Sequence, residues 1–155
     1  MESAGFATAD DIAPIGELAR LAIEEKVGTR GGDMWIRRDG RREPIEESLG
    51  PAVSEPDRLL VSGRIDEVVV GYAAVEVEEL SDGGRLGVLT DLFTHPDARG
   101  VGVGEAMMDV VIAWCGDQGC TGVDSVALPG DRHTKNFFET FGMVARAIIV
   151  HRDLE

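Results

Sequence analysis

Three glycines at alternate positions, Gly100, Gly102 and Gly104, connect a strand-like run of residues to a helical pattern. Glycines at a helix start remove Cβ atoms, so several backbone N–H groups can converge on an anion, aided by the positive end of the helix dipole. Arg99 adds a cation directly before them. The connection therefore predicts an anion site between a strand and a helix, of a kind that suits a diphosphate.

The first half of the chain predicts a helix and then a run of hairpins. A helix follows the N-cap residue Thr8 and stops at Gly28. Residues 28–57 are rich in Gly, Pro and Arg, and they predict only a helical turn near residues 46–49. Three β-branched or aromatic runs then follow at residues 59–62, 67–78 and 86–94. Their short glycine-bearing connections indicate antiparallel hairpins.

The second half of the chain alternates helices and strands. Apolar residues at helical spacing run from Val103 to Trp114, and the later segments predict a strand at 122–128, a short helix at 131–141 and a final strand at 143–151. This order predicts a mixed α/β (α+β) fold, a mixed sheet with helices on both faces. No internal repeat or linker interrupts residues 1–155, so we expect one domain.

Charge and composition narrow the classes of function. The chain carries 15 Lys and Arg against 29 Asp and Glu, a net charge of −14, which disfavours a nucleic-acid partner. No apolar run is long enough to span a membrane, and the first residues lack the pattern of a signal peptide. Cys115 and Cys120 are too few for a disulfide scaffold or a zinc site. We therefore expect a cytoplasmic protein with no metal.

Two common nucleotide motifs do not fit the glycine turn. A P-loop needs Gly-Lys-Ser/Thr, whereas Gly104 is followed by Glu105 and Ala106. A dinucleotide fingerprint needs G-x-G-x-x-G after the first strand of a βαβ unit, whereas this G-x-G-x-G turn follows a run of hairpins. A nucleotide-binding protein is therefore a disfavoured alternative.

The segment Arg99-Gly-Val-Gly-Val-Gly104 resembles the (Q/R)-x-x-G-x-(G/A) acetyl-CoA signature of the GNAT N-acetyltransferase superfamily. It stands after a strand and before a helix, as in that family. The downstream segment Asn136-Phe-Phe-Glu-Thr-Phe-Gly-Met143 resembles the family's F-Y-x-x-x-G-F segment. The resemblance is clear from about residue 68 to 154, and it implies a GNAT-like mixed sheet of six or seven strands.

The resemblance also implies residues that bind the coenzyme. Leu92, Phe93 and Thr94 would present backbone groups to the pantetheine arm, in a gap where the family's sheet splays beside the strand at 122–128. The backbone amides of the glycine turn, with Arg99, would hold the pyrophosphate; the turn consists of Gly100, Val101, Gly102, Val103 and Gly104. Asn136 is a further candidate for a hydrogen bond to the coenzyme, and Phe138 lies at a family position near the thiol.

Acetyl transfer from a thioester to an amine needs a base, an oxyanion donor and a leaving thiolate. A backbone N–H near Leu92 and Phe93 would be the donor, as in the family. Period two places Leu89, Asp91 and Phe93 on one strand face, where burial would make the Asp91 carboxylate a better base. We therefore expect Asp91 to act as general base or to orient a water. The alternative is a solvated Asp91 at the end of a pleat.

The chain departs from the family at the acid. The tyrosine that often protonates the thiolate would fall at Phe138, which has no hydroxyl. Tyr72, the only tyrosine, is expected to pack in a central strand, and His133 is a candidate substitute. A large gain in rate on Phe138→Tyr would show that the acid is missing. Neither cysteine is positioned as a nucleophile, so direct transfer in a ternary complex is expected.

The acceptor is expected to be a primary amine on a small molecule or a peptide. Residues 30–42 carry five arginines against two aspartates, so Met34 and Trp35, with Arg37 and Arg38, could form an apolar, cationic lip for an anionic acceptor; a solvated loop or a dimer contact is the alternative. A homodimer is one expectation for the assembly, because family members commonly dimerise. The competing function is a catalytically weak acyl-CoA-binding sensor or interaction module.

Overall fold

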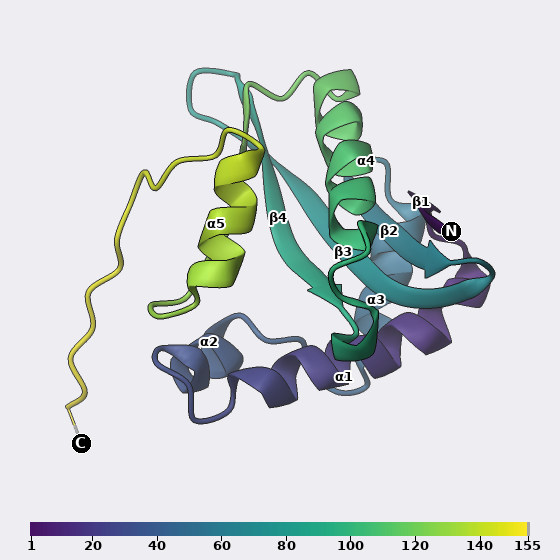
Figure 1. Ribbon diagram of the computed structural model, residues 1–155. Helices are drawn as coiled ribbons and strands as arrows, with labels where there is room; N and C mark the ends of the chain where they lie inside the picture. The colour runs from purple at the N-terminus through teal and green to yellow at the C-terminus, as the bar shows by residue number, and fades with distance from the viewer. Residues whose placement is uncertain (155) are drawn as a thin grey trace.

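The computed structural model describes residues 1–154 as one five-stranded sheet with helices on both faces (Figure 1). The strands are β1 (Glu2–Phe6), β2 (Arg58–Ile65), β3 (Val68–Glu79), β4 (Arg85–Thr94) and β5 (Gly122–Asp124). The helices are α1 (Ile12–Lys26), α2 (Gly32–Arg38), α3 (Ile45–Ser54), α4 (Val103–Asp117) and α5 (Arg132–Thr140), with short 3₁₀ turns η1 (Ala9–Asp11) and η2 (Pro96–Ala98). None of the helices within residues 1–154 is long and apolar enough to cross a membrane.

The strands lie in the sheet in chain order, β1-β2-β3-β4-β5. The first three pairings are antiparallel and the last, between β4 and β5, is parallel. The two tight turns of the hairpins contain Asp66 and Gly83, whose φ angles are 53° and 86°, in the left-handed region that such turns need. The mixed sheet and the antiparallel hairpins predicted from the sequence are therefore confirmed.

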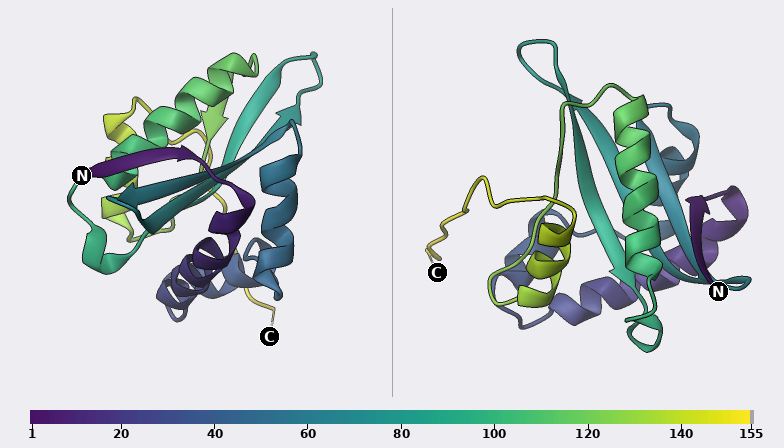
Figure 2. Two further views of the ribbon diagram at one scale, coloured as in Figure 1. Left: turned by 90° about the vertical axis from the view of Figure 1, so that its right-hand side faces the viewer. Right: turned by 45° about the horizontal axis from the view of Figure 1, so that its top comes forward.

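Helices lie on both faces of the sheet (Figure 2). Two apolar clusters pack these helices against the strands. On one face, Ile15 of α1 and Leu49 of α3 pack with Tyr72 of β3. On the other face, Met107 and Val111 of α4 pack against the strands. The strands of the sheet centre are buried on both faces, which explains their nearly continuous apolar character.

The segment expected to be a loop folds into two helices. Seven residues, Gly32–Arg38, form α2, and α3 extends to ten residues, Ile45–Ser54, where only a helical turn was predicted. Pro51 lies inside α3 and its neighbour is Gly50, so local preference argued against a longer helix. Burial of Ile45, Leu49 and Ala52 against the sheet outweighs that preference.

The predicted strand at residues 143–151 is wrong, and the sheet has five strands rather than six or seven. The residues after α5 run extended away from the body of the molecule (Figure 1). Val144 and Ile148 are 83% and 87% exposed, and the ion pair of Arg146 with Asp124 ties the segment to β5. A β-branched run has strand propensity, but a strand forms only when a neighbouring strand completes its hydrogen bonds.

Candidate active site

The glycine turn joins η2 to α4 and brings free amides together. Gly100 and Gly102 have φ angles of 84° and 95°, which a residue with a Cβ adopts only at a cost in energy. The amide of Ala106 is bonded to the carbonyl of Gly102 at 3.0 Å, so the amides that precede it in α4 have no partner within the helix. The first turn of α4 thus offers several N–H groups to an anion.

Gly104 is needed for a different reason, which is close packing against α5. A Cβ at this position would lie 3.3 Å from two ring carbons of Phe137. The close approach places the first turn of α4 beside Phe137 of α5. The two segments that carry the sequence resemblance, the glycine turn and the Asn136–Met143 region, are therefore neighbours in space.

β4 has an open edge over its last residues. Pairing with β5 ends at Val88 with Asp124, and beyond it the Ser125 hydroxyl donates to the carbonyl of Leu89 at 3.0 Å. β5 is therefore shorter than the strand predicted at residues 122–128, while β4 continues to Thr94. Strand pairing therefore ends on the side of β4 where the resemblance implies a gap.

The backbone of Leu92 and Thr94 faces this open edge. The His95 amide donates to the Val70 carbonyl on the β3 side at 2.7 Å, and backbone groups alternate along a strand. Leu92 and Thr94 therefore direct their N–H and C=O groups to the opposite side, while Phe93 faces β3 with its backbone and is buried. The Leu92 groups and the Thr94 N–H can bind a ligand in the manner of an added strand, whereas the Thr94 carbonyl accepts a hydrogen bond from Arg99.

Arg99 lies across the end of this edge. Its Nε donates to the Thr94 carbonyl at 2.9 Å, and its guanidinium carbon lies 5.3 Å from the centre of the Phe93 ring. Its Nη2 donates to both carboxylate oxygens of Glu25, in the last turn of α1, at 3.0 and 2.9 Å. The cation predicted for the anion site is therefore close to the glycine turn but paired with a carboxylate.

The Asp91 carboxylate is almost fully buried and accepts four hydrogen bonds. Arg41 holds it with a two-pronged ion pair, Nη2 to Oδ1 and Nε to Oδ2, both at 2.9 Å. The Tyr72 hydroxyl donates to Oδ2 at 2.8 Å and the Thr90 hydroxyl to Oδ1 at 2.7 Å. The Asp91 side chain is only 9% exposed, so the solvated alternative is excluded.

A β-bulge changes which residues share the face of Asp91. The register with β3 shifts between Ala74 and Val75, so Ala74 pairs with Asp91 and Val75 with Leu89, and Thr90 is the extra residue. Leu89 consequently packs in the α4 cluster and Phe93 in the cluster of α1 and α3. The prediction that Leu89, Asp91 and Phe93 lie on one face is therefore wrong for Leu89, because strict alternation fails at a bulge.

Two partners of Asp91, Arg41 and Tyr72, were not predicted as site residues. Burial opposes the charge of Arg41, but the facing Asp91 carboxylate raises the pKa of this guanidinium. Burial and the same carboxylate raise the pKa of Tyr72 well above its usual value, so it remains a phenol that donates a hydrogen bond. One signal for Tyr72 was visible in the sequence, a lone tyrosine in a central strand, but no signal separated Arg41 from the arginines around it.

A narrow cavity lies over this cluster on the side of α1 and α2. It is lined by Trp35 of α2, by Arg41, Tyr72 and Asp91, and by apolar residues of α1. The Lys26 ammonium lies 4.6 Å from the centre of the Trp35 ring. The expected acceptor lip is therefore adjacent to Asp91 through Trp35.

The other residues of the expected lip lie at the surface. Met34 is 37% exposed, and Arg37 lies near the surface as well. Arg38 forms an ion pair with Asp39. Trp35 is thus the one member of the lip that lines the cavity over Asp91.

The α5 residues expected near the thiol differ in exposure. Phe138 is 7% exposed and packs in the α4 cluster, whereas Asn136 and His133 are exposed. Phe137 and Phe138 meet edge to face, with ring centres 5.9 Å apart. Phe138 is thus a packing residue in this structure, and its expected contact with the coenzyme stays a prediction.

Phe138→Tyr is expected to lower the free energy of unfolding by about 1–3 kcal/mol, because the hydroxyl would enter an apolar cluster without a partner. Urea unfolding checks this value. Phe141→Tyr is the control, since Phe141 lies at the end of the same helix and is only partly buried, so its hydroxyl can reach water. An unchanged free energy of unfolding of the Phe138→Tyr variant would contradict this expectation, and a large gain in its kcat would show that the reaction lacks an acid.

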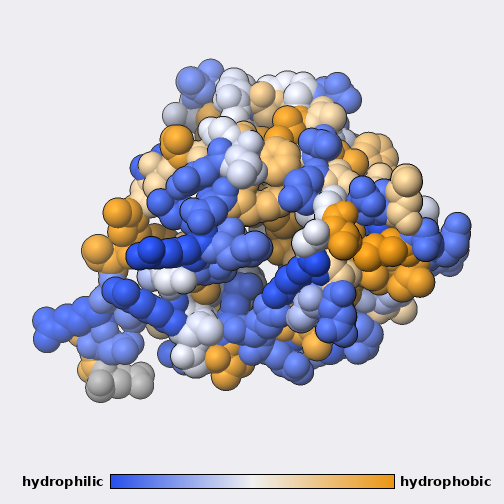
Figure 3. Space-filling model, in the orientation of Figure 1, coloured by the Kyte–Doolittle hydropathy of each residue, from blue (hydrophilic) through white to orange (hydrophobic). Residues whose placement is uncertain are grey.

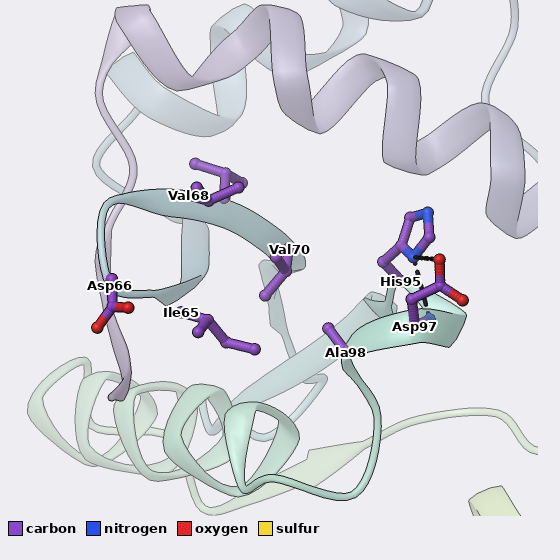
Figure 4. A pocket seen from close by; sticks show the side chains of 8 residues that line it. Ile65, Asp66, Val68, Val70, His95, Asp97 and Ala98 are labelled. Carbon is purple, nitrogen blue, oxygen red and sulfur yellow. Dashed lines mark hydrogen bonds and ion pairs between the residues drawn. The ribbon is translucent and has the colours of Figure 1, made fainter.

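A second hollow lies at the turn between β2 and β3 (Figure 4). Apolar side chains, among them Ile65, Val68 and Val70, form most of its lining, and hydrophobic residues gather over this turn in Figure 3. His95 lies at its rim and accepts a hydrogen bond from the Asp97 amide at 3.1 Å. No residue predicted for acetyl transfer lines this hollow.

The two cysteines and the acidic residues give no sign of other chemistry. Burial and the neighbouring Cys120 raise the pKa of the Cys115 thiol to about 12, so it stays protonated at neutral pH. Among residues 1–154, no group of three or more His, Cys, Asp or Glu side chains is arranged to hold a metal ion.

The sequence model of the acetyltransferase (GNAT) family matches residues 32–143, which is most of the chain. The chain therefore belongs to the GNAT family and is an acetyltransferase that uses acetyl-CoA. The free amides of the glycine turn, the close approach of α4 to Phe137 and the open edge of β4 fit that coenzyme. No curated protein matches the chain.

Solved structures with the same fold cover nearly the whole chain. The tetramutant of the BH1408 protein from Bacillus halodurans has a TM-score of 0.81 at 16% identity, over 97% of this chain and 99% of that one. A structure of AAC(6')-Iy with the bisubstrate analogue CoA-S-monomethyl-acetylneamine has a TM-score of 0.75 at 15% identity, over 99% and 98%. A predicted acetyltransferase with acetyl-CoA from Clostridium acetobutylicum has a TM-score of 0.73 at 14% identity, over 99% and 97%.

Proposed function

We propose that this acetyltransferase transfers the acetyl group of acetyl-CoA directly to a primary amine within a ternary complex. The observation that carries the proposal is the position of the buried Asp91 carboxylate, one residue before the free backbone of Leu92 at the open edge of β4. A proton acceptor and an oxyanion donor thus lie next to each other along one strand. The buried, protonated Cys115 supports direct transfer without an acyl-enzyme.

The coenzyme would lie along the open edge and end at the glycine turn. The amides of Gly100 to Gly104 and the first turn of α4 would hold the diphosphate, with Arg99 as the nearby cation. The backbone groups of Leu92 and Thr94 would bind the pantetheine arm, and the Leu92 N–H would stabilise negative charge on the acetyl oxygen.

Asp91 would act through Oδ1, because Thr90, one of the two donors to this oxygen, can turn away while Arg41 stays bonded. Its donor Thr90 has one hydroxyl proton and a second acceptor within reach, the Ala74 carbonyl at 3.3 Å. When the hydroxyl turns to Ala74, Oδ1 can accept a proton from the amine, directly or through a water. Arg41 and Tyr72 keep the carboxylate fixed meanwhile.

The leaving thiolate needs no acid from Phe138. A thiol with a pKa of about 8.5 leaves tolerably as thiolate, so an acid would increase the rate without being obligatory. The amine class agrees with the AAC(6')-Iy structure, whose bisubstrate analogue joins CoA to an acetylated amine compound. The apolar cavity wall at Trp35 and the arginines of residues 30–42 would face the acceptor.

The second candidate function is an acyl-CoA-binding sensor or interaction module with weak catalysis. One observation favours it, the lack of a hydroxyl at Phe138. It shares the coenzyme site with the first candidate, so the two differ in turnover and not in coenzyme binding.

Thermal unfolding with ligands, together with thiol release, tests the proposal. Acetyl-CoA and CoA are expected to stabilise the protein, by about 2.7 kcal/mol at a ligand concentration about 100 times Kd, while ATP does not. Thiol release from acetyl-CoA is then measured over a panel of primary amines. Release with at least one amine supports the transferase, binding without release supports the sensor, and stabilisation by ATP alone would overturn both.

A further inference from the structure

The guanidinium of Arg99 has three partners in the described part of the structure. The Thr94 carbonyl and the Phe93 ring belong to β4, so they hold the side chain at the end of the open edge. The third partner is the Glu25 carboxylate, which takes both of its hydrogen bonds from Nη2. Glu25 is distant in sequence, since 74 positions separate it from Arg99.

Glu25 occupies Nη2, one of the two terminal nitrogens with which the Arg99 guanidinium can bind an anion. A guanidinium binds carboxylate and phosphate with the same parallel N–H donors, so one group can stand in place of the other. Arg99 directly precedes the free amides of the glycine turn, where the diphosphate is expected. The carboxylate therefore has the chemistry and the position of a competitor for the diphosphate.

Removing this carboxylate would leave the guanidinium in place. Arg99 keeps its bond to the Thr94 carbonyl and its contact with the Phe93 ring, neither of which involves Glu25. The Arg99 and Glu25 side chains are 42% and 43% exposed, so the pair lies at the surface and the fold does not depend on it. The main effect of the substitution would thus be on ligands that need a free cation.

We propose that Glu25 sets the affinity of the protein for its coenzyme, by pairing with Arg99 where the diphosphate would otherwise bind. The proposal rests on the proposed function, because it requires the diphosphate at the glycine turn. Coenzyme binding then breaks one ion pair and forms another, so the free protein binds less tightly than the amides and cation would allow.

Titration calorimetry with CoA tests the proposal. Glu25→Gln is expected to lower the Kd for CoA about two- to fivefold, the range for an exposed ion pair. Glu24→Gln is the matched control: it removes the same charge from the next position of α1, and within residues 1–154 the Glu24 side chain forms no ion pair. The Kd for inorganic pyrophosphate should fall in the Glu25→Gln protein as the Kd for CoA does. S-acetylpantetheine lacks the diphosphate, so its Kd should be the same for both variants.

Comparing the Kd for CoA between single and double variants isolates the effect of the ion pair between Arg99 and Glu25. Arg99→Gln should weaken CoA binding, and in that background Glu25→Gln should no longer change it. Equal Kd values for the Glu25→Gln and Glu24→Gln proteins, or weaker binding by the Glu25→Gln protein, would overturn the proposal while leaving the proposed function intact. A wild-type protein that does not bind CoA would overturn both.

Discussion

Asp91→Asn is expected to lower kcat about 10²–10⁴-fold, the range for loss of a general acid or base, with little change in the Kd for CoA. An amide cannot accept hydrogen bonds on both of its terminal atoms, so one atom would face a donor of Arg41 or Tyr72 without bonding to it. Breaking this buried ion pair should also cost about 3–5 kcal/mol of stability. Single-turnover thiol release on the folded protein measures the first effect and urea unfolding the second.

Arg41→Lys is the control for Asp91→Asn. It keeps the carboxylate and the positive charge but loses the two-pronged geometry, so it lowers stability without removing the proton acceptor. The Asp91→Asn protein should therefore lose far more activity than the Arg41→Lys protein, when both are measured where they are folded. A kcat of the Asp91→Asn protein within about threefold of wild type, well short of the loss expected for a missing base, would exclude Asp91 from the chemistry.

Gly102→Ala is expected to raise the Kd for CoA about tenfold or more. A residue with a Cβ strains the backbone at the φ of 95° that Gly102 adopts, at a cost of about 1–2 kcal/mol. Relief of that strain would turn the peptide groups whose N–H bonds converge at the start of α4. Calorimetry with CoA measures the affinity, and thermal unfolding measures the loss of stability.

Gly116→Ala is the matched control in the same helix. Gly116 does not adopt a positive φ, and an added Cβ would meet no atom within 4 Å. Alanine there should stabilise the protein by about 0.5–1 kcal/mol and leave CoA binding unchanged. An equal Kd for the Gly102→Ala and wild-type proteins would show that the glycine turn does not bind the coenzyme.

The sequence predicted the elements whose cause is local. The hairpins follow from β-branched runs with turn residues between them, and α4 follows from its apolar spacing after the glycine turn. The glycine turn lies between a strand and a helix as predicted, and the structure adds that Gly100 and Gly102 have positive φ angles. These features depend on neighbouring residues only, so the chain itself carries the information.

The site was predicted in part. The position of Asp91 on β4 and the open edge beside Leu92 came from the resemblance, and both are present. The bulge at Thr90 was not predicted, since a register shift depends on the hydrogen bonds of the partner strand. The strand expected at residues 143–151 failed for the same reason, because no partner strand pairs with it in the part of the chain described.

What the sequence determined by itself is thus the order of elements from β2 to α5, the amide-rich turn at Gly102 and the family to which the chain belongs. The tertiary structure alone decided the partners of the charged groups. Arg41 meets Asp91 across 50 positions and Glu25 meets Arg99 across 74, because folding places α1 and the segment after α2 against β4. Long side chains with the same charge look alike in a sequence, and only burial and distance show which carboxylate each one binds.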